Sequence, residues 1–277
     1  MVYYADDTIL FSRSNRGLNE LLKHTELISL KYGLRLNRDK CVAIAMNNEG
    51  HIHFEDGSCL EKQFETTYLG NELNREVNIL HEISNKIQQV RGTWMKLHVY
   101  WKATNASKKW KLIIYDAIIR SKLLYGLETV QLTQGMLKKL DVFQLKGLRK
   151  ILGMTTTYIN RANNNQKVFQ EATRAAFPKQ GDTRRIKSFS EAYAERKASL
   201  LGHILRSNQD DPLRQISFQT DTAYRVEYGK KRVGKPRQNW IHQTKKYVYV
   251  NKFNMFSYDE SKQQDNQIMR YAKERKF

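Results

Sequence analysis

Two adjacent carboxylates, Asp6 and Asp7, lie in an otherwise apolar and β-prone run at the start of the chain. The residues on either side, 2–4 and 8–11, are aromatic, branched or otherwise apolar and predict two short strands with Ala5, Asp6 and Asp7 at the bend. Neighbouring like charges repel each other and lose solvation unless a cation neutralises them. Mg²⁺ prefers oxygen ligands and binds one or two carboxylates together with substrate phosphates. The pattern indicates a divalent-metal site, and a polar hairpin turn is the simpler alternative.

The charge balance of the chain is strongly basic. The 277 residues include 48 Lys and Arg against 28 Asp and Glu, which gives a formal net charge of +20. Such an excess attracts polyanions and favours phosphate contacts, so nucleic acid is the expected partner. No membrane partner is expected, because no stretch approaches a transmembrane span. The 40% of apolar residues predicts a folded chain with enough length for one large or two modest domains.

The cysteines and histidines do not suggest a zinc site. Cys41 and Cys59 are the only cysteines, and neither belongs to a close Cys/His cluster. His51 and His53 alternate on an expected strand, where exposed polar positions are the simplest interpretation. The chain opens without a signal-peptide pattern, from which we expect a reducing intracellular setting.

The first 74 residues predict an α+β arrangement. Apolar residues recur at helical spacing over residues 16–32, and Gly33 provides a stop. Strands are expected over residues 42–46, 52–54 and 64–69, with a turn at Asp56 and Gly57.

From Asn74 the pattern becomes helical. Asn74 is a candidate N-cap for one long helix through Trp101, and a second helix is expected after Ser107, running toward Gly126. A third helix is expected from Thr133 to Gly153, which together gives a three-helix bundle. Residues 75–153 hold 15 basic and 5 acidic residues, so the polar surface of this bundle should be positive.

The rest of the chain is more polar. Residues 154–187 predict a loop or linker with short helical pieces at most. Ser188 and Glu191 form a capping-box pattern that opens a further helix. Residues 225–252 hold nine basic residues and one acidic residue, and we expect them to be non-compact alone; the residues from Ser257 predict a polar helix or frayed tail.

The string Tyr4-Ala5-Asp6-Asp7 with its hydrophobic flanks closely resembles the active-site hairpin of reverse transcriptases. Residues 33–40 resemble the turn after the palm helix of these enzymes, in which Asn is followed three residues later by Lys. That resemblance makes Lys40 the candidate for assisting the leaving pyrophosphate by charge or proton donation. The alternative is an ordinary solvated loop lysine.

Residues 64–70, which end in Tyr68-Leu69-Gly70, resemble the element that grips the primer in non-LTR (LINE-type) reverse transcriptases. The resemblance implies primer contacts by Tyr68, Leu69, Gly70 and Tyr4. Gly70 would allow a sugar-phosphate chain to approach the backbone closely. A plain strand end is the alternative.

Further motifs follow in the family's order. Residues 75–153 resemble the thumb, with matching segments at 121–126 and 148–153. Residues 201–206 and 234–240 resemble the linker downstream of the polymerase in several non-LTR lineages. The resemblance covers nearly the whole chain up to about residue 245, and the order of its motifs is more specific than any one of them.

Two basic segments have competing interpretations. The segment 230–237 is similar to a minor-groove hook, and its basic residues are either that hook or a solvated linker that contacts phosphates: Lys230, Lys231, Arg232, Lys235 and Arg237. Trp94, Trp101 and Trp110 alternate with lysines and could stack on bases, but their helical spacing favours a core role for Trp94 and Trp101.

These observations predict a fragment of an α+β polymerase. Its parts are a partial palm over residues 1–74, a helical thumb over 75–153, a linker over 154–187 and a basic, partly flexible helical region over 188–277. The resemblance implies an RNA-directed DNA polymerase that uses two Mg²⁺ ions held by Asp6, Asp7 and an Asp of an earlier palm strand. Because that Asp and the fingers are not in the sequence, the isolated chain is expected to be inactive.

The implied partners are an RNA template, a DNA primer or target and, in the intact enzyme, dNTP. An intact element would act in the nucleus. Two alternatives stay open: a non-enzymatic basic nucleic-acid-binding module, and a fragment of a reverse transcriptase of the group II intron maturase type.

Overall fold

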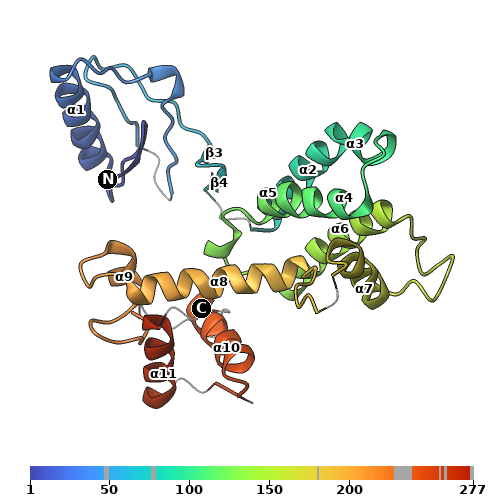
Figure 1. Cartoon of the computed structure of the whole chain (residues 1–277). Helices are drawn as coiled ribbons and strands as arrows, with labels where there is room; N and C mark the ends of the chain where they lie inside the picture. Colours follow the sequence, from blue (N-terminus) through green and yellow to red (C-terminus); the bar gives the residue numbers. More distant parts are fainter. Residues whose placement is uncertain are drawn as a thin grey trace. The chain divides into compact units, whose positions relative to one another are not determined.

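The computed structural model describes residues 1–46, 50–75, 79–179, 181–227, 239–255, 257–258 and 261–274. The fold is mixed α+β, mostly helical, with two separate two-stranded antiparallel sheets among the described residues. The chain forms two compact units, Met1–Asn78 and Ile79–Phe277 (Figure 1). None of the described helices combines the length and apolar character needed to cross a bilayer.

Unit 1 contains one long helix and two hairpins. Its elements are β1 (Val2–Tyr4), β2 (Asp7–Ile9), α1 (Asn15–Lys31), the short 3₁₀ helix η1 (Arg38–Lys40), β3 (Glu65–Tyr68) and β4 (Asn71–Asn74). The Ser14 hydroxyl caps α1 by accepting a hydrogen bond from the Gly17 amide, and the chain leaves the helix through Gly33 at φ +71°. The helix predicted over residues 16–32 is confirmed.

The core of unit 1 is small and is built from Leu22 of α1 with Ala43, Ile52, Phe54 and Leu60. The strands predicted over 42–46 and 52–54 do not form as regular strands. Only isolated bridges occur there, between Ala43 and Lys62 and between His53 and Cys59. These single bridges suffice to turn the apolar side chains of Ala43, Ile52 and Phe54 into the core. The alternation of apolar and polar residues here therefore reflects burial, and it does not require a continuous set of hydrogen bonds between strands.

β3 confirms the strand predicted near residues 64–69, but the expected N-cap at Asn74 is wrong. Asn74 is the last residue of β4, where it pairs with Glu65 of β3. The following helix, α2 (Ile79–Lys96), begins later.

The regular elements of unit 2 within its described residues are all helices, joined by loops. After α2 come α3 (His98–Ala103), α4 (Lys108–Ile114), the π-helical turn η2 (Tyr115–Arg120), α5 (Ser121–Leu124), η3 (Leu127–Thr129), α6 (Gln134–Leu152), α7 (Asn165–Ala176), α8 (Phe189–Arg206), α9 (Pro212–Ser217), α10 (Trp240–Lys252) and α11 (Lys262–Lys273). The predicted second helix appears as α4, η2 and α5 in one continuous run. The third is confirmed as α6, with Thr133 as N-cap and Gly153 at φ +73° beyond its end.

The single long helix predicted through Trp101 is wrong, because the chain breaks at Leu97 between α2 and α3. In one continuous helix, Trp94 and Trp101 would lie about 10 Å apart along the axis. In the structure their rings stack with centroids 4.6 Å apart, and the Trp101 indole donates to the Trp94 carbonyl oxygen at 3.1 Å. The stacked pair requires the break.

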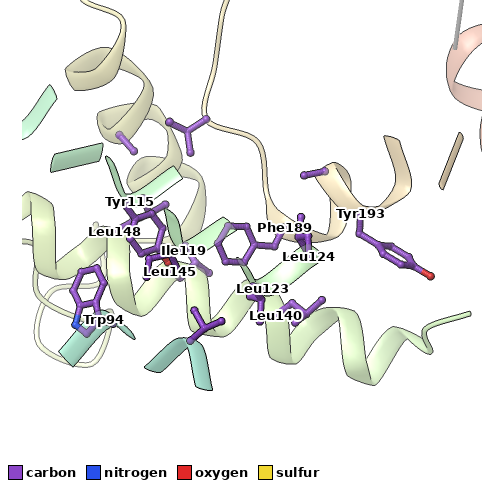
Figure 2. Packing of buried hydrophobic residues seen from close by; sticks show 14 of the residues in the cluster. Trp94, Tyr115, Ile119, Leu123, Leu124, Leu140, Leu145, Leu148, Phe189 and Tyr193 are labelled. Carbon is purple, nitrogen blue, oxygen red and sulfur yellow. The ribbon is translucent and has the colours of Figure 1, made fainter. Parts of the chain in front are cut away.

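The first core of unit 2 joins α2 to α8. Figure 2 shows Tyr115 and Phe189 among the leucines of α5 and α6, with their rings parallel and 6.2 Å apart between centroids. Trp94 is buried and Trp101 packs against this core, which confirms the core interpretation for both, whereas Trp110 is 58% exposed.

The structure differs from the predicted linker over residues 154–187. Residues 165–176 form α7, which buries Val168, Ala172 and Ala176 along one face. This face packs against α4 and α6. Small residues at a spacing of four make a narrow apolar stripe, which allows α7 to pack closely.

The C-terminal region has its own core. Leu201, Ile204 and Leu205 of α8 pack with Val248 of α10 and Ile268 of α11. Of the two alternatives predicted from Ser257, a polar helix or a frayed tail, the helix forms as α11 over residues 262–273, and it packs into this core. A buried ion pair reinforces it, because Lys245 contacts Asp265 at 2.8 Å and the Tyr258 hydroxyl donates to the same carboxylate oxygen at 2.5 Å.

Candidate active-site hairpin

The β1–β2 hairpin presents the acidic pair at a two-residue turn. Tyr4 pairs with Asp7, Tyr3 with Thr8 and Val2 with Ile9, so Ala5 and Asp6 form the connection and Asp7 begins β2. Ala5 has φ +52°, a left-handed value that glycine usually supplies at the first position of such turns. A side chain held in this conformation costs about 1–3 kcal/mol, a cost that recurs where the backbone serves a function.

Both carboxylates of the pair are exposed. Among the residues that the structure describes, neither accepts a hydrogen bond from a side chain or forms an ion pair. The pair lies neither in a helix nor against a buried arginine, and either arrangement would exclude a metal role. Exposed oxygen ligands without a cationic partner fit a hard divalent ion that keeps several of its waters.

The acidic pair is an incomplete ligand set within the described residues. No third acidic, histidine or cysteine side chain of the described ranges lies within ligand distance of Asp6 and Asp7. Two carboxylates leave most positions of an octahedral ion to water, phosphate or another protein ligand.

Lys40 is the last residue of η1 and is exposed. Its amide donates to the Asn37 carbonyl oxygen at 3.1 Å, which closes the turn. Neither Asp6 nor Asp7 is joined to Lys40 by a hydrogen bond or ion pair in the described structure. The structure places the lysine on a formed turn of the same unit.

A polar network holds the Lys40 turn in place. Arg38 donates to Glu26 of α1 at 3.0 Å and to Asp56, and its guanidinium lies 4.6 Å from the centroid of the Phe54 ring. Glu26 is 7% exposed, and its second oxygen accepts from the Glu55 amide at 2.8 Å. Hydrogen bonds from Ser58, together with Arg38, hold the pKa of Asp56 below its ordinary value.

The sequence interpretation missed Glu26 and Arg38. The sequence did contain a signal for Glu26. Residue 26 falls on the same helical face as Leu18 and Leu22, and an acid on an apolar, buried face needs a hydrogen-bonding or charged partner.

The β3–β4 hairpin carries Tyr68, Leu69 and Gly70. Tyr68 pairs with Asn71, so Leu69 and Gly70 are the two central residues of the turn, with φ +47° and +76°. Positive φ at both positions is the geometry of a type I′ turn, which suits Gly but strains Leu. The Tyr68 hydroxyl is buried and has no hydrogen-bond partner within the described ranges.

The surface of the helical block is positive. Its exposed charged side chains in residues 79–153 are all basic: Arg91, Lys96, Lys102, Lys108, Lys109, Lys122, Lys138, Lys139, Lys146 and Lys150. Three of its acids are half-buried and have partners: Asp116 pairs with Arg120, Glu128 with Arg196, and Asp141 accepts a hydrogen bond from Ser190. Burial raises the pKa of Asp116. The half-buried acids are thus already paired, and the fully exposed charge of this block is positive.

The predicted hook lies outside the described residues, with all five of its basic side chains: Lys230, Lys231, Arg232, Lys235 and Arg237. Both of its flanks belong to unit 2. Phe218 bridges to Arg225 before it, and the Asn239 side chain caps α10 after it by accepting from the His242 amide at 3.1 Å.

Comparisons of the chain with known proteins find no family model that matches and no similar curated protein or solved structure.

Proposed function

We propose that this chain is the rear palm, thumb and downstream linker of a non-LTR retrotransposon reverse transcriptase, an RNA-directed DNA polymerase in the intact protein. The observation that carries the proposal is the presentation of Asp6 and Asp7 on a left-handed hairpin turn, exposed and without a cationic partner in the described structure. The assignment to this family rests on the resemblance of residues 33–40, 64–70 and 75–153 to segments of non-LTR reverse transcriptases. Such an element would act inside the cell, in the nucleus.

Asp6 and Asp7 would hold Mg²⁺ in the intact enzyme. The bound ions would supply activation of the primer hydroxyl and charge stabilisation of the departing pyrophosphate. Because the pair lacks a third ligand within the described residues, the chain alone is expected to be inactive.

The other residues of unit 1 take supporting roles in this proposal. Lys40, on the turn fixed by Arg38 and Glu26, would place a positive charge or a proton at the leaving pyrophosphate. The strained turn at Leu69 and Gly70 would seat the primer strand beside Tyr68, and Tyr4 would support it next to the acidic pair. The exposed lysines of unit 2 would contact phosphates of the RNA template and DNA primer without reading sequence.

The test is primer extension by complementation. The purified chain is mixed with a separately produced fingers and first-palm-strand polypeptide of a non-LTR reverse transcriptase, an RNA template, a DNA primer, dNTP and Mg²⁺. The chain alone should extend nothing, and the mixture should extend the primer. Asp6→Asn and Asp7→Asn should each abolish extension, because each removes a metal ligand.

Asp39→Asn is the matched control, since Asp39 is an exposed acid of the same unit that the proposal does not use. Extension by the mixture that survives both hairpin substitutions contradicts the proposal. So does templated synthesis by the chain alone.

A second candidate is a nucleic-acid-binding module without catalysis. The all-basic exposed charge of residues 79–153 favours it, because that surface needs no acidic pair to bind phosphates. Under this alternative, complementation fails while salt-sensitive binding to nucleic acid remains intact.

A further inference from the structure

The loop between α6 and α7 exposes a tyrosine almost completely. The loop spans residues 153–164, and Tyr158 and Ile159 near its middle are 97% and 72% exposed. Because the Tyr158 ring packs against nothing in the fold, both of its faces are open to a ligand, and loops of this kind often carry binding residues.

The loop is ordered by hydrogen bonds at its base. The Asn163 side chain is 8% exposed and donates to the carbonyl oxygen and the hydroxyl of Thr155, at 3.1 and 3.0 Å. Arg149 of α6 donates to the Asn163 carbonyl oxygen at 3.1 Å and to the Asn165 side chain at 3.0 Å. The amides of Ile159 and Asn160 both donate to the Thr156 carbonyl oxygen. The tyrosine is therefore presented by a formed loop.

A basic cavity adjoins this loop. The cavity has a volume of about 360 Å³ and is lined by both ends of the loop, Met154 and Asn163, together with Lys108, Lys167 and Arg174. Its one acid, Glu171, is already paired with Arg174 at 3.2 Å. The lining carries a net positive charge and suits an anionic group.

The two features together match one kind of ligand. An aromatic ring stacks on a base that has left its own stack, and neighbouring cations bind the phosphates of the same strand. A base inside a duplex is already stacked on its neighbours, so a fully exposed ring selects an unpaired base. Tyr158 is four residues from Met154, which limits its distance from the cavity to roughly 14 Å and keeps both features within reach of one short strand.

We propose that the 153–164 loop and the adjoining cavity bind single-stranded nucleic acid, with Tyr158 stacking on an unpaired base and Lys108, Lys167 and Arg174 contacting phosphates. This inference rests on the proposed function, because it assigns the strand-binding site of the same protein. Arg161, also exposed on the loop, adds a further phosphate contact.

The test is fluorescence anisotropy of the full chain with a short single-stranded oligothymidine. Tyr158→Ala should weaken binding by about 5- to 150-fold, the usual loss for one stacked base. Tyr158→Phe should bind like the wild type. Lys167→Gln and Arg174→Gln should each lower the slope of log affinity against log salt by about 0.7, while Tyr158→Ala leaves that slope unchanged.

Two controls isolate stacking from charge and from folding. On a strand of the same length that carries abasic sites throughout, Tyr158→Ala should bind as the wild type does. Tyr32→Ala removes a tyrosine of unit 1 that is 79% exposed and should not affect binding.

Wild-type affinity in Tyr158→Ala, a loss that persists on the abasic strand, or no binding by the wild type would each overturn the inference. So would a Tyr158→Ala variant that binds the strand normally but no longer sediments with anionic vesicles, because the loop would then be a membrane contact. Failure of the proposed function shows separately, as primer extension that does not depend on Asp6 and Asp7.

Discussion

The indole nitrogen of Trp240 donates a hydrogen bond of 2.7 Å to the backbone carbonyl oxygen of Glu128, a residue 112 positions earlier in the chain. The Glu128 carboxylate in turn accepts two hydrogen bonds from Arg196 of α8, at 3.0 and 3.2 Å. Lys197, the next residue of α8, lies 5.4 Å from the centroid of the Trp240 ring. Trp240, the first residue of α10, is therefore anchored to the helices of residues 79–206. The C-terminal helices and these earlier helices fold as parts of one unit.

Trp240→Phe should keep most of the ring contacts and lose the hydrogen bond. We expect a loss of about 1 kcal/mol in the free energy of unfolding, measured by urea denaturation. Trp110→Phe is the control, because that ring is 58% exposed, and it should change stability by less than about 0.5 kcal/mol. Equal effects of the two substitutions would show that the Trp240 anchor contributes nothing.

Because of Lys197, the stability of unit 2 should increase as the pH rises above 8. The side chain is 4% exposed, bonds to the Gln131 amide oxygen and lies 5.4 Å from the centroids of the Tyr193 and Trp240 rings, and burial lowers its pKa to about 8. The folded state therefore binds fewer protons than the unfolded state between pH 8 and the ordinary value of 10.5, so this group favours folding more as the pH rises.

Lys197→Met should remove that dependence. Between pH 10 and pH 8 the wild type should lose roughly 2–3 kcal/mol of stability relative to the variant, as followed by urea denaturation at each pH. A constant difference between the two proteins over this range would contradict the account.

Gly147 and Gly92 should respond to alanine in opposite directions. A Cβ at Gly147 of α6 would lie 2.6–2.8 Å from the hydroxyl oxygen and two ring carbons of Tyr115, which is fully buried and cannot move aside. Gly147→Ala should cost about 1–3 kcal/mol by overpacking. A Cβ at Gly92 of α2 would meet no atom within 4 Å, so Gly92→Ala should stabilise the helix by about 0.5–1 kcal/mol. Thermal denaturation of both variants tests the pair, and a stabilised Gly147→Ala would refute the packing described here.

Acid should weaken the network around the Lys40 turn. Hydrogen bonds from Ser58 and Arg38 depress the pKa of Asp56 below its ordinary value of 3.8, so its contribution to stability is complete above that value and is lost as the pH falls below it. The melting temperature of wild-type unit 1 should fall across this acidic range, and that of Asp56→Asn should fall less steeply. Asp39→Asn should follow the wild type. Parallel curves for wild type and Asp56→Asn would exclude the network as the source of acid sensitivity.

Local patterns predicted the elements whose signals lie within a few residues. Thr133 and Gly153 bound α6, and Gly33 ends α1, as the sequence predicted, because caps act on the nearest backbone groups; the Ser14 cap of α1 was not predicted. The break at Leu97 could not be predicted in this way, since the spacing of Trp94 and Trp101 is equally compatible with a continuous helix. The packed helices α7 and α11 were also underestimated, because Ala172 and Ala272 become core residues only through distant partners.

For the candidate site, the sequence predicted the hairpin with Ala5, Asp6 and Asp7 at its bend, but not the left-handed conformation of Ala5 at φ +52°, which has no signature in an alanine. Glu26 and Arg38 meet only through the fold of unit 1. Tyr158 resembles any other loop tyrosine in the sequence, and its exposure depends on the Asn163 and Arg149 contacts that hold the loop.

The measurement that tests the account most directly is Mn²⁺-induced relaxation of the backbone amide signals of the full chain. Mn²⁺ replaces Mg²⁺ at oxygen sites and broadens nearby resonances. Titration with Mn²⁺ should selectively broaden the amide signals of residues 4–8. The double variant Asp6→Asn/Asp7→Asn should lose this broadening, and Asp39→Asn should keep it. Unbroadened hairpin signals in the wild type, or broadening that persists without both carboxylates, would contradict a shared divalent cation at this turn.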